Sequence, residues 1–571
     1  MAGSVDPGPP GERAGPRRSA GRCDVAVLGT GLPASVLAAI LAARGADVVL
    51  VGTDDEPEPS ARGEVTVPYL SLLLRQLAVR YEVPGLAGVA GFAALREHVG
   101  PSAGLARSLG FVYHRAGRDP LAQEVDQLAT PNAAPAEAIL HRPETDAYLL
   151  RLALASGAGL RRHPAVAGVV EGPEGVELTT TDGVTLRCRY VVDAVGRASP
   201  LARLFGLRDG APATRHASRA IHGHLLGVRP FDEVVPGPEF RPPVPWHAGP
   251  LHHVCADGVL TVTPFANHRK AGNPLTGVEL TLDADASQAD ASRAGAAPAG
   301  AGPEEEFWAT VARYPGIAAH LRGARPAGRL TATPGPQGYR STRLLGDRWC
   351  LLGDSAGHVE PLLAQPLVVA LETVGALAWR LLAALRDDDF SPRRFAPVGE
   401  VGQALLDSNE ALAAQVAAAR GEYLLWKAVL RVWETGLLYG TFQMLAALGE
   451  LRRTGSDEAL RRREERSLAG YPFPGHRGYR LLQEQTSSVL DAVAAGATDG
   501  ARAGLGLLDD LAATGIAPPP FKLTDPAERF YYPRPPVIAK VVRWTYRGAP
   551  PGVGPLVRAG LRNLVLQRLT R

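Results

Sequence analysis

Lysine is almost missing from this sequence of 571 residues. Four of its 61 basic residues are lysines, and the first of them is Lys270. The others are arginines, and against 58 acidic residues they leave a formal net charge of +3. This balance excludes the strongly basic surface with which proteins bind nucleic acid. It also means that chemistry requiring a lysine amine has no candidate residue before position 270.

Cysteine is scarce as well. The four cysteines are scattered, with no CxxC pair and no Cys/His spacing typical of zinc sites: Cys23, Cys188, Cys255 and Cys350. In a chain of this length, such a distribution predicts reduced, buried thiols rather than a disulfide framework. We therefore expect no structural disulfide and no bound metal.

Long apolar runs are the third missing feature, and we expect no transmembrane segment. Residues 1–22 hold few apolar side chains and are predicted to form a disordered tail. Arg17-Arg18 before an apolar stretch resembles a twin-arginine export signal, but a strand, turn and helix explain the same residues better. A cytoplasmic location is the resulting prediction.

Strand and helix patterns alternate after the tail. "DVAVLG", "PASVLAAILAARG" and "ADVVLV" predict a βαβ unit, and two hairpins are expected, one turning at Asp182-Gly183 and one within residues 252–265. From about residue 366 the pattern is mainly helical. Residues 285–306, rich in Ala, Gly and Glu, are expected to form a mobile insertion.

A glycine-rich turn stands between the first strand and the first helix: Gly29-Thr30-Gly31-Leu32-Pro33-Ala34. Its glycines permit a tight turn and a close approach of the backbone to a pyrophosphate, which then lies on the helix N-terminus. The surrounding strand, turn and helix favour a dinucleotide site. A ribose-binding carboxylate is expected after the second strand; Asp54 is the candidate, and a solvated acidic loop is the alternative.

Two later segments have the same character. "YVVDAVGRASP" ends a buried strand at Asp193, and "CLLGDSAGHVEP" places Gly353, Asp354 and Gly357 between a strand and a long helix. Carboxylates and tight turns at the carboxyl ends of strands lie where ligands bind in open α/β sheets. Each segment alone is also compatible with a simple turn that an aspartate caps.

The three segments read GxGxxA (29–34), DxxGxxS (193–199) and GDxxG (353–357). Motifs of this kind in this order resemble those of the FAD-dependent monooxygenase superfamily. Further segments resemble its flavin-dependent halogenases: "ARGEVTVP" (61–68), "REHVGPSAGLARSLGFVYHR" (96–115), "WHAGPLHHVCADGVLTVTPFANH" (246–268) and "NPLTGVELTLD" (273–283). The resemblance implies FAD as cofactor, with Glu64 and Arg142 added to the three motifs as cofactor-binding residues. It also implies a separate flavin reductase, and a substrate that is either a small molecule or bound to a carrier protein.

The resemblance also implies an architecture. We expect an α/β fold with a Rossmann-like FAD-binding domain of the glutathione reductase and hydroxybenzoate hydroxylase type over residues 23–390. A β-sheet substrate domain is expected within it, at about 90–180 and 210–340. A mainly helical region follows at 391–571.

This sequence departs from the halogenase pattern in three places. The family's lysine, which holds hypohalous acid beside the substrate, corresponds to Ala106. The family's Trp-x-Trp-x-Ile-Pro motif corresponds to residues 259–264, where only Pro264 matches. The family's halide-binding glycine corresponds to Pro366, which has no N–H to donate and a fixed φ. Pro366 is equally compatible with the first turn of a helix.

From these departures we predict an FAD-dependent oxidoreductase that tailors a secondary metabolite by monooxygenation through a flavin C4a-peroxide. The alternatives are a genuine halogenase with an altered halide site, and a non-redox catalyst or binding protein on a retained fold. No catalytic residue is assigned, although His358 and Glu360 follow the GDxxG turn and are able to act as acid or base. His252, His253 and His268 are interpreted as hairpin and turn residues rather than metal ligands.

Overall fold

The structure is a computed structural model of the chain. It describes residues 21–52, 65–130, 135–162, 165–211, 214–235, 237–284, 301–333, 335–359, 366–465 and 471–569. Most of the predicted tail, Asp54, Glu64, Glu360 and most of the 285–306 insertion lie outside these residues. The last residues of that insertion belong to helix α7 (Pro303–Ala312), although they were expected to be part of the mobile insertion.

The predicted βαβ unit is confirmed as β1 (Arg22–Leu28), α1 (Leu32–Ala43) and β2 (Val48–Gly52). Its two strands pair in parallel within a mainly parallel sheet, the FAD-domain sheet, whose strand order is β18-β19-β10-β1-β2-β7. Successive residues of β1 enter the cores on opposite sides of this sheet, Val25 and Val27 on one and Ala26 and Leu28 on the other. Both faces are therefore covered, as a parallel sheet requires. The other strands are β7 (Gly159–Arg162), β10 (Thr185–Asp193), β18 (Leu345–Gly346) and β19 (Trp349–Leu351).

The hairpin predicted at Asp182-Gly183 is confirmed, because β9 (Gly175–Thr180) pairs antiparallel with the start of β10. Together with β8 (Val166–Gly172), it extends the FAD-domain sheet. The substrate sheet was expected to reach residue 180, but β7, β8 and β9 belong to the other sheet. The sequence pattern of these strands does not reveal which of the two sheets they join, because both sheets contain hairpins.

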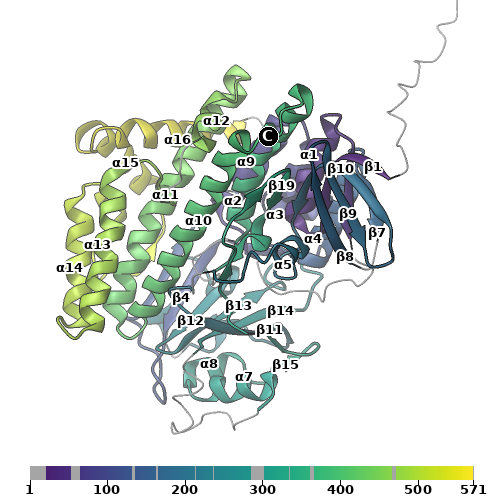
Figure 1. Cartoon of the computed structure of the whole chain (residues 1–571). Coiled ribbons are helices and arrows are strands. Elements are labelled where there is room, and N and C mark those ends of the chain that lie inside the picture. The colour runs from purple at the N-terminus through teal and green to yellow at the C-terminus, as the bar shows by residue number, and fades with distance from the viewer. Residues whose placement is uncertain are drawn as a thin grey trace, which may run out of the picture.

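The second sheet, the substrate sheet, has the strand order β15-β11-β14-β13-β12-β4-β5-β21. The second predicted hairpin is its centre, where β12 (Leu251–Cys255) pairs with β13 (Gly258–Pro264). Helices α7 and α8 (Pro315–His320) pack below this sheet (Figure 1). Its other strands are β4 (Ser108–Tyr113), β5 (Val125–Ala129), β11 (Ser218–Leu226), β14 (Thr276–Asp283), β15 (Arg325–Pro326) and β21 (Phe530–Tyr531).

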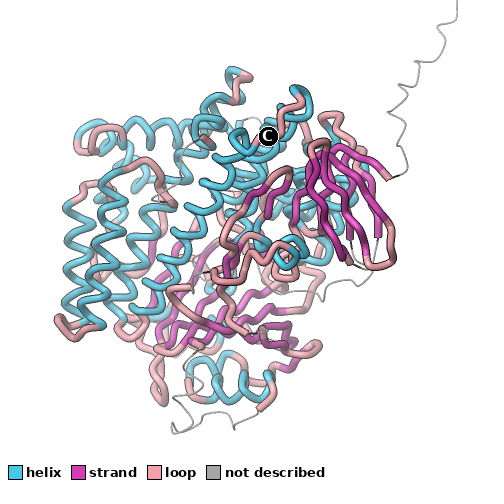
Figure 2. Tube along the Cα trace, in the orientation of Figure 1, coloured by secondary structure: helices cyan, strands magenta, loops and turns pink. Residues whose placement is uncertain are grey.

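Long helices form a layer beside both sheets, as Figure 2 shows on the left of the molecule. This layer contains α9 (Pro366–Asp387), α10 (Pro392–Ala419), α11 (Tyr423–Thr454), α12 (Glu458–Glu464), α13 (Arg477–Ala494), α14 (Gly500–Ala513), α15 (Pro535–Arg547) and α16 (Val553–Leu569). The C-terminal segment also returns to the substrate sheet, because Phe530 of β21 pairs with Gln127 of β5.

Helix α9 is long and apolar enough to cross a membrane by length and composition, although no transmembrane segment was expected. In the fold, 78% of its most apolar window is buried inside the protein. It packs against α1, α2 (Pro68–Arg80) and α10. Its apolar residues are therefore accounted for by the protein core.

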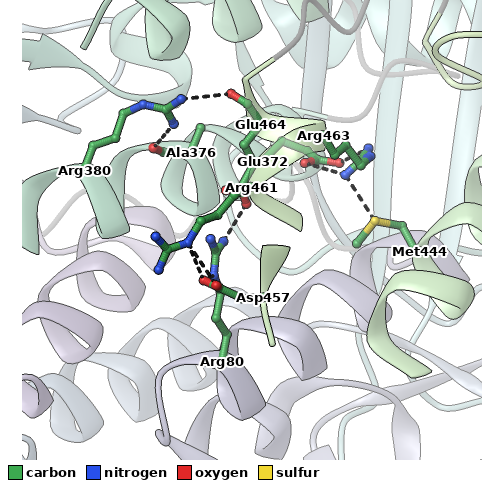
Figure 3. Close-up of polar contacts among 9 residues, drawn as sticks. All are labelled: Arg80, Glu372, Ala376, Arg380, Met444, Asp457, Arg461, Arg463 and Glu464. Carbon is green, nitrogen blue, oxygen red and sulfur yellow. Dashed lines mark hydrogen bonds and ion pairs between the residues drawn. The ribbon is translucent and has the colours of Figure 1, made fainter. Parts of the chain in front are cut away.

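Buried ion pairs join the helical layer to the FAD domain. Arg463 of α12 binds Glu372 of α9 through both Nη atoms, at 3.0 and 2.6 Å, and also donates to Tyr69 Oη at the start of α2. Beside it, Arg80 of α2 donates to Glu464 at 2.6 Å (Figure 3). Helix α12 thereby fixes α2 to α9. Helix α2 follows residues 53–64 in the chain, and α9 follows residues 360–365.

Candidate active site

The three motifs identified in the sequence meet at one edge of the FAD-domain sheet. Leu28, the last residue of β1, is the register partner of Asp193, and Asp193 is the partner of Leu351 on β19. Because these strands are parallel, their carboxyl ends lie side by side. The turns that begin at Gly29 and Gly353 therefore leave the sheet from either side of Asp193.

The first turn has the backbone that its glycines predict. Gly29 has φ +101°, and a Cβ there would lie 2.9 Å from the Ala194 carbonyl oxygen, so only glycine fits. Gly31 is the N-cap of α1. A Cβ atom placed on Gly31 would have no heavy atom within 4 Å, so the space at this helix N-terminus is open. Thr30 is half-buried, and its carbonyl accepts from Ser35 Oγ at 2.9 Å.

The rest of this motif builds the helix. Pro33 lies in the first turn of α1, where its missing N–H leaves no hydrogen bond unmade. Leu32 and Ala34 are buried in the core between α1 and the sheet. The open N–H groups of this turn can receive a pyrophosphate, as predicted for a dinucleotide site.

Asp193, predicted to bind the cofactor, is held by hydrogen bonds within the protein, and its assignment to the cofactor stays a prediction. It is fully buried, and its carboxylate accepts from Ser199 Oγ at 2.6 Å, Ser355 Oγ at 3.0 Å and the N–H groups of Val195 and Leu201. Burial raises the pKa of this carboxyl, and these donors oppose the rise. Its oxygens are engaged within the protein, so Asp193 holds the segments around the cofactor site together from inside.

The Gly353-Asp354 turn is the third part. Gly353 has φ +58°. A Cβ atom placed on Gly353 would lie 3.1 Å from the Cβ of Ala370 on α9. The Asp354 side chain is 45% exposed, and its Oδ1 lies 3.2 Å from Nδ1 of His358. Unlike Asp193, this carboxylate is accessible to a ligand.

A small cavity of about 10 Å³, the space of roughly one water molecule, opens beside this turn. Its lining comes from the turn, the start of α9 and the middle of α10: Gly353, Asp354, Gly357, His358, Val359, Pro366, Val369, Leu406 and Asn409. Two buried atoms in it, Nε2 of His358 and Oδ1 of Asn409, have no hydrogen-bond partner among the described residues. Buried polar atoms normally have partners, and a cavity of this size has room for an ordered water beside these two atoms.

Arg142, which the resemblance assigns to the cofactor, begins α4 (Arg142–Ala155), and α4 packs on α1. Its guanidinium binds Asp146 with N–O distances of 3.0 and 2.9 Å, so part of its donor capacity is used within the helix. Asp54 and Glu64 lie outside the described residues, and their assignment to the cofactor stays a prediction.

The position of the family's lysine lies on a small sheet, where β3 (Gly104–Ala106) pairs with β6 (Glu137–Ile139). Ala106 is buried in an apolar cluster with Ile139 and Phe265. Its register partner is Glu137, whose carboxyl accepts from Thr66 Oγ1 and Ser71 Oγ. Burial raises the pKa of Glu137. This strand pair therefore carries a carboxyl group and no amine.

The hairpin histidines do not form a metal site. His253 Nδ1 lies 2.8 Å from Nε2 of His114, and its Nε2 lies 2.9 Å from Nδ1 of His320. The three rings are thus joined in series by hydrogen bonds, with no common point for a metal. His252 lies 2.9 Å from Thr261 Oγ1, and His268 lies 3.2 Å from the Ala103 carbonyl. This agrees with their interpretation as hairpin and turn residues.

Sequence reasoning missed two residues of the site. Ser355 was passed over because a serine inside a turn is common, and only the register of β10 with β19 brings it to Asp193. Asn409 lies in the middle of α10, 52 residues after Gly357 in the chain, and no local pattern relates it to the turn. The cysteine prediction is confirmed, since each of the four is a buried free thiol.

Comparisons with known proteins agree with this geometry. A family described as "FAD binding domain" matches residues 22–240. The tetracycline 7-halogenase of Kitasatospora aureofaciens is 34% identical over 95% of this chain and 96% of its own length. The monodechloroaminopyrrolnitrin halogenase PrnC of Pseudomonas fluorescens is 33% identical over 83% of this chain and 82% of its own.

Solved structures give the same result. The crystal structure of halogenase PltM in complex with phloroglucinol and FAD matches with a TM-score of 0.81 and 25% identity, over 89% of this chain and 99% of that one. The open Gly31 turn and the exposed Asp354 carboxylate fit FAD at the edge of the FAD-domain sheet. The chain belongs to the flavin-dependent halogenase family and is an FAD-dependent enzyme.

Proposed function

We propose that this chain inserts oxygen into a hydroxylated aromatic compound, as an FAD-dependent monooxygenase within the halogenase family. The observation that carries the proposal is Ala106, packed against Ile139 and Phe265 where the family's lysine is expected. A methyl group cannot hold hypohalous acid beside a substrate. No lysine precedes Lys270 in the sequence, and the register partner of Ala106 is the carboxyl-bearing Glu137.

FAD, once reduced, supplies the electrons with which O2 is activated. The residues of this chain have other tasks. The open N–H groups at Gly31 are suited to the pyrophosphate, and the Asp354 carboxylate is suited to accept from a cofactor hydroxyl. Arg142, Asp54 and Glu64 are the further residues that we assign to the cofactor. A separate flavin reductase is the expected source of the reduced cofactor.

The substrate class follows from a relative. PltM is described in complex with phloroglucinol, a benzene ring with three hydroxyl groups. By analogy we assign a small hydroxylated aromatic compound to this chain, either free or attached to a carrier protein. Such a ring is electron-rich, which suits both oxygen insertion and halogenation.

Halogenation is the second candidate, and the relatives favour it over the first. The tetracycline 7-halogenase and PrnC are named as halogenases, and their likeness extends over most of this chain. A genuine halogenase would then need a halide site in which Pro366, the first residue of α9, replaces an N–H donor. Turnover of phloroglucinol by protein supplied with photoreduced FAD, with and without bromide, distinguishes the candidates. A hydroxylated product in both samples supports the proposal, and a brominated product contradicts it.

A further inference from the structure

The C-terminal part of the chain carries charge of one sign. Nine basic residues and no acidic residue lie at positions 529–571, although acidic and basic residues are nearly balanced in the chain as a whole. These positions include α15 and α16, which lie together at one end of the helical layer (Figure 1). The near-neutral net charge of the chain therefore conceals a local excess of positive charge on one pair of helices.

Helix α15 exposes its basic side chains to solvent. Lys540, Arg543 and Arg547 are exposed, and their spacing of three and four residues places them along one side of the helix. The opposite side, with Val541 and Thr545, is buried against the protein. The helix therefore lies flat on the protein with its cations outward.

These three cations have no acidic neighbours. Helix α15 packs on α16 and on the 3-10 helix Pro519–Phe521, and neither of these contains an acidic residue. Among the described residues, no carboxylate forms an ion pair with any of the three. Exposed arginines elsewhere differ, since Arg462 of α12 pairs with Glu458 on its own helix. The positive charge of α15 is therefore available to an anionic partner.

Beside the cations, α15 exposes two apolar side chains one helical turn apart. Tyr546 is 71% exposed, the highest value among the large hydrophobic residues that the structure describes, and Val542 is 37% exposed. The guanidinium of Arg558, from α16, lies 4.3 Å from the centroid of the Tyr546 ring and donates to the Thr545 carbonyl at 2.6 Å. The aromatic ring is therefore held at the surface, next to the cations.

This combination fits an anionic lipid surface better than an acidic protein. A basic helix that lies flat and exposes an aromatic ring suits peripheral membrane binding, because cations attract anionic headgroups and tyrosine rings favour the interfacial layer. A specific protein interface normally buries about 800 Å² on each partner around an apolar centre. Val542 and Tyr546 alone are too few to form such a centre.

We propose that α15 binds this protein to anionic phospholipid, with Lys540, Arg543 and Arg547 at the headgroups and Tyr546 in the interfacial layer. The binding is peripheral and reversible, because a few cations and one ring provide a limited attraction. High salt weakens it by screening the charges. The inference goes beyond the proposed function, since it concerns where the enzyme acts and not which product it forms.

Sedimentation with vesicles tests the inference on the full-length protein. We expect binding at low salt to vesicles of equal parts phosphatidylcholine and phosphatidylglycerol, and no binding to phosphatidylcholine alone. The triple variant Lys540→Gln, Arg543→Gln, Arg547→Gln should lower the partition coefficient about a hundredfold, at about fivefold for each cation.

The matched control removes three charges from exposed positions of α13 and α14. It carries Arg477→Gln, Arg480→Gln and Arg502→Gln and should keep the binding of the unmodified protein. The two triple variants have the same net charge, so a difference between them reports the position of the charges.

A second measurement locates the contact. Tyr546→Cys is labelled with an environment-sensitive fluorophore, which is selective because the four native thiols are buried. We expect its emission to shift to shorter wavelength when anionic vesicles are added. The same label on Leu481→Cys, a 48% exposed position of α13, should not respond.

The inference is overturned if anionic vesicles do not sediment the protein, if the two triple variants bind equally, or if the label at position 546 does not respond. Binding to soluble poly-glutamate that depends on α15, without binding to vesicles, would also overturn it and would identify an acidic protein as the partner. None of these outcomes depends on whether the product gains oxygen or halogen, so the inference and the proposed function can fail separately.

Discussion

Ser355 Oγ donates a hydrogen bond to the Asp193 carboxylate at 3.0 Å, joining two motifs that lie 162 residues apart in the chain. Ser355 Oγ also accepts from the Gly196 N–H at 2.8 Å. The turn after β10 and the turn after β19 are thus held in one arrangement by a buried carboxylate and a hydroxyl group. The edge of the sheet proposed to bind FAD is preorganised by these hydrogen bonds within the protein.

Asp193→Asn tests this arrangement. The amide has the same shape but replaces one acceptor oxygen by an NH2 group that faces donors, so we expect a loss of about 3 kcal/mol in the free energy of unfolding. Urea denaturation followed by circular dichroism measures the loss. Asp209→Asn, at an exposed position of the same region, should change the free energy by less than about 0.5 kcal/mol. Equal midpoints for the two variants would show that the Asp193 carboxylate does not hold the turns.

Arg463 provides a second test with a control on the same helix. Arg463→Met leaves Glu372 buried without its partner, and we expect a cost of about 3–5 kcal/mol. Arg462 of α12 binds Glu458, and these side chains are 53% and 69% exposed. Arg462→Met should cost less than about 1 kcal/mol. Thermal or urea unfolding of both variants compares the two costs; similar losses would contradict the idea that α12 locks α2 to α9.

The buried histidines predict sensitivity to acid. Burial lowers the pKa of His114, His252 and His320 to about 3, against about 6.5 in the unfolded chain. Between these values the unfolded chain binds more protons, so stability is complete above about pH 6.5 and falls as the pH decreases toward 3. Each histidine contributes about 1.4 kcal/mol per pH unit in this range.

His320→Gln isolates one of these protons. The dependence of unfolding free energy on pH, measured by urea denaturation between pH 6 and about pH 4.5, should become shallower by about 1.4 kcal/mol per pH unit. This slope is informative even if the variant is less stable throughout. An unchanged slope would mean that His320 is already protonated in the folded protein.

The parts of this site that could be predicted are those whose residues are adjacent in the sequence. The Gly29–Ala34 turn, the two hairpins and the Gly353-Asp354 turn are local patterns, and the structure contains them. The role of Asp193 was not visible, because its donors come from positions 199, 201 and 355 and depend on strand register. Asn409 and the Ala106–Glu137 pairing were equally inaccessible, since both require the packing of segments that the sequence separates.

Ala106→Lys tests whether the missing amine limits the reaction. We expect this variant, combined with Glu137→Gln to prevent an ion pair across the strands, to brominate phloroglucinol when bromide is supplied. Arg107→Lys places a lysine one residue away and should not. Mass spectrometry of the products gives the answer. If neither variant brominates while both still consume reduced FAD, the loss of the lysine is not the limiting change.

The central claim is that this chain inserts oxygen. Its most direct test is mass spectrometry of the product formed from phloroglucinol by the unmodified protein, with photoreduced FAD, isotopically labelled O2 and an excess of bromide. The account predicts a product that gains one labelled oxygen atom and no bromine. A brominated product without labelled oxygen would contradict it and would establish halogenation.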